Sequence, residues 1–184
     1  TTINDWHTTP NTARINASNP CSEYLQVDDS SCNLGSANLM KFVNEDGSFR
    51  VADFRRVISL ATKSMDLNYD ISSFPTKRIA EISNSISPLG VGYTNLGSWL
   101  MFQGFAYDSE EGRAAAAAVT ALMTGQVYLT STELAEKIGP FKEFEKNREE
   151  TIRVLTKHRD SIKRIDRTKL PTGLEAVLNE AEVV

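Results

Sequence analysis

Residues 15–24 read INASNPCSEY, and they place an amide, a thiol and a carboxylate at alternate positions: Asn19, Cys21 and Glu23. In an extended backbone, alternate residues point to the same side of the chain. Pro20 and the surrounding turn-forming residues disfavour a helix here. The spacing therefore predicts that the three side chains converge on one small volume.

These three groups suit a substrate that bears adjacent hydroxyls. An amide can donate and accept hydrogen bonds, a thiol can carry a radical or act as a nucleophile, and a carboxylate can take a proton. The spacing alone leaves a structural interpretation open, because a single cysteine in a loop is usually a small buried residue. An Asn-Pro pair is usually a turn, and an exposed glutamate is usually only solvated.

The composition excludes several classes of function. The chain has 184 residues, of which 40% are hydrophobic and 24% charged, as in an ordinary globular domain. Its net charge of −4 shows no excess of positive charge that would attract a nucleic-acid polymer or an anionic membrane. A nucleotide partner would therefore be a small substrate. We expect no membrane partner, because no apolar run approaches the roughly 20 residues of a membrane span.

The two cysteines, Cys21 and Cys32, indicate a cytoplasmic protein whose thiols have individual roles. Two cysteines do not make a secreted disulfide framework. Neither lies in a C-x-x-C pair, and a chain with only two histidines offers few ligands for a zinc site. A thiol redox protein that uses both cysteines is disfavoured for the same reason. The start of the chain has no initiator Met and no features of a signal peptide, which suggests a piece of a longer chain.

Periodicity predicts short strands first and helices afterwards. Residues 1–20 are expected to form a loop, and residues 23–41 two short strands that flank a turn at residues 28–31. A further turn is predicted at residues 44–48. An amphipathic helix is predicted from residue 51 to 65, and another from Pro75 to Ile86, ended by Pro88.

Four further helices are predicted after Pro88. Residues 89–105 read as a buried core helix with closely packed glycines, because Gly-Val-Gly lacks the rest of a dinucleotide-binding fingerprint. Residues 110–138 form a long helix that Gly125 can interrupt. Residues 142–163 are expected to be a solvated outer helix, anchored by Ile152 and Leu155, rather than a binding surface. A short helix within 171–184 is expected to be capped by Thr172, with Glu175 three residues later.

Several ordered motifs together resemble the large subunits of ribonucleotide reductases. They are residues 15–24, residues 28–39 (DDSSCNLGSANL), the opening at residues 2–8 and the LGVGYTNLG run at residues 89–97. The Asn-Pro-Cys-x-Glu form is most similar to the adenosylcobalamin-dependent class II enzymes. The resemblance extends to about residue 159 and fades in the tail.

The resemblance implies an α/β fold, predominantly helical, that is a partial piece of a ten-stranded α/β barrel with a finger loop. Residues 1–50 would supply the finger loop and short strands of the catalytic barrel, and residues 51–184 its helical part. A partial barrel exposes strand edges and apolar faces. We therefore expect that the isolated chain either self-associates or keeps its first 40 residues mobile.

The resemblance also implies a role for each site residue. Cys21 would become the thiyl radical that removes the 3′-hydrogen of the ribose, and Glu23 would act as the general base that takes the 3′-hydroxyl proton. Asn19 would orient the substrate hydroxyls. Cys32 would be one of two redox-active cysteines, with its partner absent from this chain; without the resemblance, it reads as a buried strand thiol.

The implied cofactor of the full enzyme is adenosylcobalamin, and no segment of this chain is expected to bind it or another metal. The implied partners are a ribonucleotide substrate, the remainder of the reductase chain and a thioredoxin-like reductant. Pro171-Thr172-Gly173 is only a superficial echo of the expected substrate phosphate loop. The alternative is a stand-alone helical interaction module, or a partner in a split reductase, that keeps the motif without activity.

Overall fold

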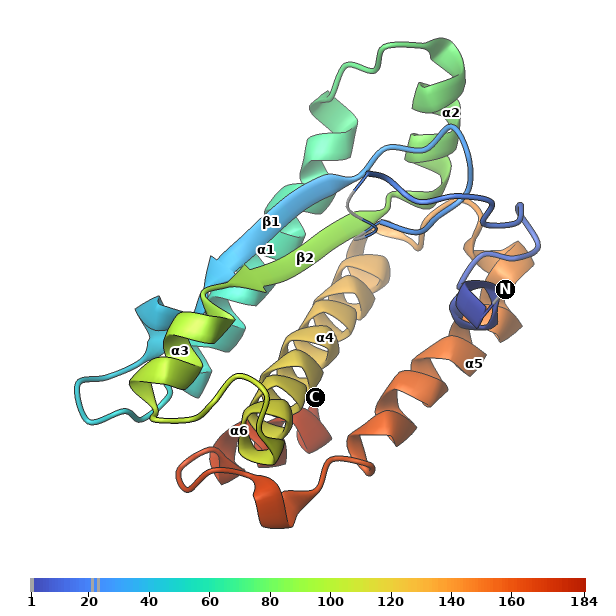
Figure 1. Cartoon of the computed structure of the whole chain (residues 1–184). Helices are drawn as coiled ribbons and strands as arrows, with labels where there is room; N and C mark the ends of the chain where they lie inside the picture. Colours follow the sequence, from blue (N-terminus) through green and yellow to red (C-terminus); the bar gives the residue numbers. More distant parts are fainter. Residues whose placement is uncertain (1, 21, 23) are drawn as a thin grey trace. The chain divides into compact units, whose positions relative to one another are not determined.

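The computed structural model describes residues 2–20, 22 and 24–184, so Cys21 and Glu23 lie outside the described residues. The described chain is mostly helical with two strands, which confirms the predicted fold class (Figure 1). Its elements in chain order are η1 (Thr2–Trp6), β1 (Asn33–Asn38), η2 (Leu39–Phe42), α1 (Val51–Ile71), α2 (Lys77–Ile86), β2 (Leu89–Thr94), α3 (Leu96–Phe102), α4 (Glu110–Ile138), α5 (Phe144–Ile162), η3 (Arg167–Lys169) and α6 (Glu175–Val183).

The chain divides into two compact units. The first comprises residues 1–34, 63–90 and 132–158, and the second comprises residues 35–62, 91–131 and 159–184. Helices α1, α4 and α5 and both strands therefore contribute residues to each unit. The predicted division into residues 1–50 and 51–184 as parts of a catalytic barrel stays a prediction.

The strands β1 and β2 pair in a two-stranded sheet and run in the same direction (Figure 1). Parallel neighbours need a long crossover connection, which here contains α1 and α2. The first of the two strands predicted between residues 23 and 41 does not form among the described residues. The hydroxyl of Tyr24 donates to Ser30 Oγ, and Ser30 Oγ donates to the carbonyl of Val27, so local side-chain bonds hold this segment in a turn.

The predicted core helix over residues 89–105 is wrong in its first half, which is the strand β2. Helix α3 begins only after Asn95, whose φ of 64° lies in the left-handed region. Asparagine tolerates this conformation better than most residues, so it can turn the chain sharply between a strand and a helix. A short apolar run does not distinguish a buried strand from a buried helix by periodicity alone.

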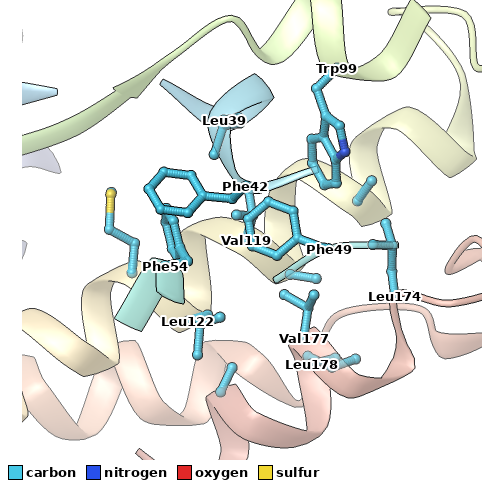
Figure 2. Close-up of a cluster of buried hydrophobic side chains, with 14 of the residues drawn as sticks. Leu39, Phe42, Phe49, Phe54, Trp99, Val119, Leu122, Leu174, Val177 and Leu178 are labelled. Atoms are coloured by element: carbon cyan, nitrogen blue, oxygen red, sulfur yellow. The ribbon is translucent and has the colours of Figure 1, made fainter. Parts of the chain in front are cut away.

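An aromatic cluster forms the centre of the core of the second unit (Figure 2). The rings of Phe42 and Phe54 meet edge to face with centroids 5.2 Å apart, and Phe49 lies 5.3 Å from Phe54 and 5.5 Å from Trp99. Such tilted pairs add to the stabilisation from burial alone. Helix α4 and the C-terminal segment complete this core with Ala114, Ala115, Ala118, Val119, Leu122, Leu174, Val177 and Leu178.

Two details of the predicted helices need correction. Gly125 does not interrupt α4, and a Cβ at this position would lie 3.3 Å from a methyl group of Val184, so the glycine allows a close approach. Helix α6 starts after Leu174 without a side-chain cap, so Thr172 is not its capping residue. The carboxylate of Glu175 instead accepts a hydrogen bond from the backbone N–H of Gly173 at 2.7 Å.

None of the helices in the described part of the chain combines the length and apolar character that crossing a membrane requires.

We predict that Phe54→Ala destabilises the second unit strongly, because Phe54 is fully buried in the aromatic cluster. The expected loss in the free energy of unfolding is about 3–5 kcal/mol, measured by chemical denaturation. Leu60→Ala on the same helix is the control, because 57% of Leu60 is exposed. Its expected effect is within about 0.5 kcal/mol. Equal losses for both variants would contradict the assigned core.

Candidate functional site

The loop that contains the predicted catalytic residues is closed at its base by Asn19 and Tyr24. The side-chain oxygen of Asn19 accepts a hydrogen bond from the backbone N–H of Tyr24 at 3.0 Å. The backbone N–H of Asn19 donates to the carbonyl of Tyr24 at 3.3 Å. The two ends of the segment that carries Cys21 and Glu23 are therefore joined by two bonds, one of which uses the Asn19 side chain.

The backbone at Ser22, between these ends, is turned and not extended. The backbone N–H of Ser22 donates to the carbonyl of Asn19 at 3.1 Å, and Ser22 has a φ of 64°. Ser18 reinforces the turn, because its hydroxyl donates to the same Asn19 carbonyl at 2.8 Å. The described backbone at Ser22 is therefore not extended, and the convergence of Asn19, Cys21 and Glu23 stays a prediction, because Cys21 and Glu23 lie outside the described residues. The roles predicted for Cys21 and Glu23 stay predictions.

Tyr24 connects this loop to the surroundings of Cys32. Burial raises the pKa of the Tyr24 phenol well above its ordinary value, the hydrogen bond to Ser30 opposes this rise, and a charge on the nearby Cys32 adds to it. The phenol therefore stays protonated at neutral pH and donates to Ser30 Oγ at 2.8 Å. Asn19 and Cys32 thus both have Tyr24 as a neighbour.

The segment around Cys32 is fixed by α1 and α2. Ser31 donates to the buried Ser83 hydroxyl twice, from its backbone N–H at 2.9 Å and from its own hydroxyl at 3.0 Å. The hydroxyl of Tyr69 lies 3.0 Å from the carbonyl oxygen of Ser31 and 2.5 Å from that of Pro88. A single side chain of α1 therefore contacts the segments that enter both strands, and Ser83 of α2 also holds the segment that enters β1.

Further contacts define the environment of the Cys32 thiol. The side-chain amide of Asn33 donates to the carbonyl of Met65 at 2.8 Å, which adds another bond to α1. The half-buried thiol itself lies 3.4 Å from the carbonyl oxygen of Asn33. Burial raises the pKa of Tyr69 to about 12, so a second protonated phenol lies near Cys32.

Gly90 of β2 lies directly beside the thiol. A Cβ at this position would lie 2.9 Å from Cys32 Sγ and would overlap a methyl group of Leu34. The run at residues 89–97 was singled out in the sequence for its glycines, but it was interpreted as helix packing. Only the pairing of β1 with β2 reveals that Gly90 makes room for Cys32.

Helix α5 holds the segment that leads into the loop. Asn147 is fully buried, and its side chain accepts from the backbone N–H of Asn11 at 2.8 Å and donates to Thr12 Oγ1 at 2.8 Å. Thr151 donates to the carbonyl of Thr8 at 2.8 Å. The prediction of a merely solvated outer helix missed this polar interface. The expected anchor Ile152 is 51% exposed, and the side chains that α5 buries are Asn147, Thr151 and Val154.

A buried histidine organises the turn before the loop. The ring nitrogen Nδ1 of His7 accepts from the backbone N–H of Thr9 at 3.3 Å, and Nε2 lies 2.8 Å from the carbonyl oxygen of Ala13. This pattern requires the neutral ring with its proton on Nε2. Burial lowers the pKa of His7, and the hydrogen bond to Ala13 only partly opposes that effect.

The described residues beside the loop line a small hollow. A hollow of about 280 Å³ is lined by Arg14, Ser18 and their neighbours, which is below the roughly 300–1,000 Å³ of typical ligand pockets. No group of three or more His, Cys, Asp or Glu residues that could hold a metal ion occurs in the described part of the chain.

Comparison with known families identifies the class of this domain. The family described as ribonucleotide reductase, barrel domain, matches residues 1–176. The chain therefore belongs to the ribonucleotide reductase family and is a portion of its barrel domain. This result confirms the resemblance inferred from the sequence motifs.

The similar curated proteins are several times longer than this chain. It is 48% identical over 164 residues to a vitamin B12-dependent ribonucleotide reductase of Streptomyces avermitilis, covering 87% of this chain and 17% of the relative. The corresponding protein of Streptomyces coelicolor is 45% identical over 185 residues, which are 98% of this chain and 19% of the relative. A vitamin B12-dependent ribonucleoside-diphosphate reductase of Mycobacterium tuberculosis is 32% identical over 147 residues, with coverages of 80% and 21%. The chain thus spans about a fifth of the length of these relatives.

We predict that the turn around His7 loosens as the pH falls below about 6.5, the unperturbed pKa of histidine. Because the pKa of His7 is lowered in the folded state, the unfolded state binds more protons in this range. The folded state therefore becomes less stable as the pH decreases. Protonation of Nδ1 also removes the acceptor for the Thr9 N–H. Hydrogen exchange at the Thr9 amide, corrected for its intrinsic pH dependence, should accelerate between about pH 7.5 and 5.5.

His7→Gln should abolish this pH dependence at Thr9 while leaving the pH response near His158, whose pKa burial also lowers. Unchanged protection of the Thr9 amide in the wild-type chain across this range would contradict the assignment.

Proposed function

We propose that this chain supplies the radical-bearing loop and one reducing thiol of a vitamin B12-dependent ribonucleotide reductase. The observation that carries the proposal is the closed turn at Asn19 and Tyr24, in a chain that belongs to the reductase family. The turn contains the positions of Cys21 and Glu23, and Tyr24 lies next to Cys32. The reaction is the reduction of ribonucleotides to 2′-deoxyribonucleotides. In this proposal the chain is inactive alone, because it spans only about a fifth of the length of its relatives.

The proposed division of labour conserves atoms and electrons. A sulfur radical on Cys21 takes the hydrogen atom from the ribose C3′, forming an S–H bond, and returns it after reduction. Glu23 takes the 3′-hydroxyl proton, and general base catalysis of this kind typically contributes about 10²–10⁴-fold. The 2′-hydroxyl leaves as water. Two thiols become a disulfide and supply two electrons and two protons, which place a hydrogen on C2′ and complete the departing water, and Glu23 returns its proton to the 3′-oxygen. Cys32 is one of these thiols, and the second belongs to a cysteine outside this chain.

The cofactor is assigned to other parts of the protein. The relatives are vitamin B12-dependent by name, and we extend this dependence, as adenosylcobalamin, to the full-length protein. Two hollows on the described surface have volumes of about 330 and 280 Å³, and neither can enclose a corrin macrocycle. The residues that line them do not fit the cofactor, so no catalytic step in this chain is derived from it.

The proposed partners follow from the same chemistry. They are the ribonucleotide substrate, the remainder of the reductase chain and a thioredoxin-like protein that reduces the disulfide. The proposal includes a cytoplasmic location, because reduced thiols persist in a reducing compartment.

The proposal predicts different effects of substitution at Cys21 and at Glu23. In the full-length reductase, Cys21→Ser should abolish reduction while nucleotide binding stays nearly intact, because serine cannot carry the radical. Glu23→Gln should slow reduction by about 10²–10⁴-fold through loss of the base. Glu45→Gln is the matched control, because Glu45 is an exposed carboxylate. Appreciable deoxynucleotide formation by Cys21→Ser would overturn the proposal.

A separate prediction distinguishes the two functions of the Asn19 amide. Asn19→Asp keeps the oxygen that accepts from the Tyr24 N–H but removes the NH₂ donors available to substrate hydroxyls. We expect reduction to slow by about tenfold or more while the Tyr24 amide keeps its protection from hydrogen exchange. Asn19→Ala should lose both activity and protection. If Asn19→Asp is fully active and only Asn19→Ala fails, Asn19 serves loop closure alone.

A further inference from the structure

Gly90 has no side chain, and the Cys32 thiol lies close to the place where one would stand. The position where a Cβ would stand lies 2.9 Å from Cys32 Sγ, which is closer than real side chains approach one another. The same Cβ would overlap a methyl group of Leu34. Two side chains of the neighbouring strand segment therefore occupy the space that alanine at position 90 would take.

The backbone around Cys32 cannot retreat easily from such an alanine. Ser31, the residue before it, is bonded twice to Ser83, and its carbonyl oxygen lies 3.0 Å from the Tyr69 hydroxyl. The Tyr69 hydroxyl also lies 2.5 Å from the carbonyl oxygen of Pro88, two residues before Gly90. Both sides of the contact are thus held at a fixed separation, and only the side chains can move.

Leu34 and Cys32 differ in their freedom to move. Leu34 is 61% exposed, so its side chain can turn toward solvent at little cost. Cys32 is half-buried and has the buried phenols of Tyr24 and Tyr69 as neighbours. The thiol would therefore be displaced from its rotamer.

We propose that Gly90 is a positioning residue for Cys32: it keeps open the volume in which the thiol turns between its reduced and disulfide-bonded geometries. A disulfide requires a narrow range of distance and torsion angle, so the sulfur needs rotamer freedom to form one. This inference rests on the proposed redox role of Cys32. In that step, Cys32 and a second cysteine of the full-length chain together give two protons and two electrons to the substrate, their S–H bonds break and an S–S bond forms.

The test is Gly90→Ala in the full-length reductase, with two readouts. The first is the rate at which iodoacetamide alkylates Cys32, followed by mass spectrometry of the Cys32 peptide. The second is the rate of ribonucleotide reduction. We expect both to fall by up to about tenfold, the effect of forcing a side chain from its preferred rotamer, with nucleotide affinity unchanged. Unchanged alkylation of Cys32 would overturn the inference.

Gly92→Ala is the matched control on the same strand. A Cβ at Gly92 would lie 3.6 Å from Ser36 Oγ, which is ordinary contact, so both rates should match those of the wild type. An equal loss at Gly92 would show that any alanine in β2 is harmful and would overturn the specific role of Gly90.

The double variant Gly90→Ala with Leu34→Ala separates the contact with Leu34 from the contact with Cys32. Because it removes the overlap with Leu34, it also serves if Gly90→Ala alone folds poorly. It leaves the contact with Cys32 in place, so slow alkylation should persist. Complete recovery would mean that Gly90 serves only Leu34, and the inference would fail. Cys32→Ser tests the proposed function separately: if it sustains multiple turnovers with a thioredoxin-like reductant, the redox role of Cys32 fails, whatever Gly90 does to alkylation.

Discussion

The Tyr69 hydroxyl, buried between the carbonyl oxygens of Ser31 and Pro88, is the contact on which the candidate site depends. It joins helix α1 to the segments that enter both strands. A hydroxyl has one hydrogen, so the two carbonyls share a single donor, and loss of that donor would leave buried acceptors unsatisfied. The register of Cys32 against Gly90 follows from this contact and from the bonds between Ser31 and Ser83.

Polar contacts also hold the loop at residues 19–24 and the residues before it. Asn147 of α5 holds the segment at Asn11 and Thr12, and Asn19 closes the loop on Tyr24. These contacts are mainly polar, whereas the core of the second unit is an apolar and aromatic cluster (Figure 2). Polar bonds are directional and therefore fix positions more narrowly than apolar contacts do. This difference suits a segment that must present side chains for chemistry.

The sequence motifs predicted the family, and apolar spacing predicted the helices α1, α2 and α4, because long amphipathic or apolar segments with clear stop signals are distinctive. The strand β2 was missed, since a glycine-rich apolar run fits a strand or a helix. The interface of α5 was missed because its buried residues include the polar Asn147 and Thr151. The positive φ of Ser22 and the proximity of Gly90 to Cys32 depend on tertiary contacts that no local pattern records.

The most direct test of the account is hydrogen exchange in the full-length reductase with Tyr69→Phe, which removes the hydroxyl and keeps the ring. The account predicts that peptides covering residues 24–34 and 88–90 lose protection, while peptides from the aromatic core around Phe42 and Trp99 keep theirs. Unchanged protection at residues 24–34 would contradict the claim that the Tyr69 hydroxyl is required to hold the Cys32 segment in place.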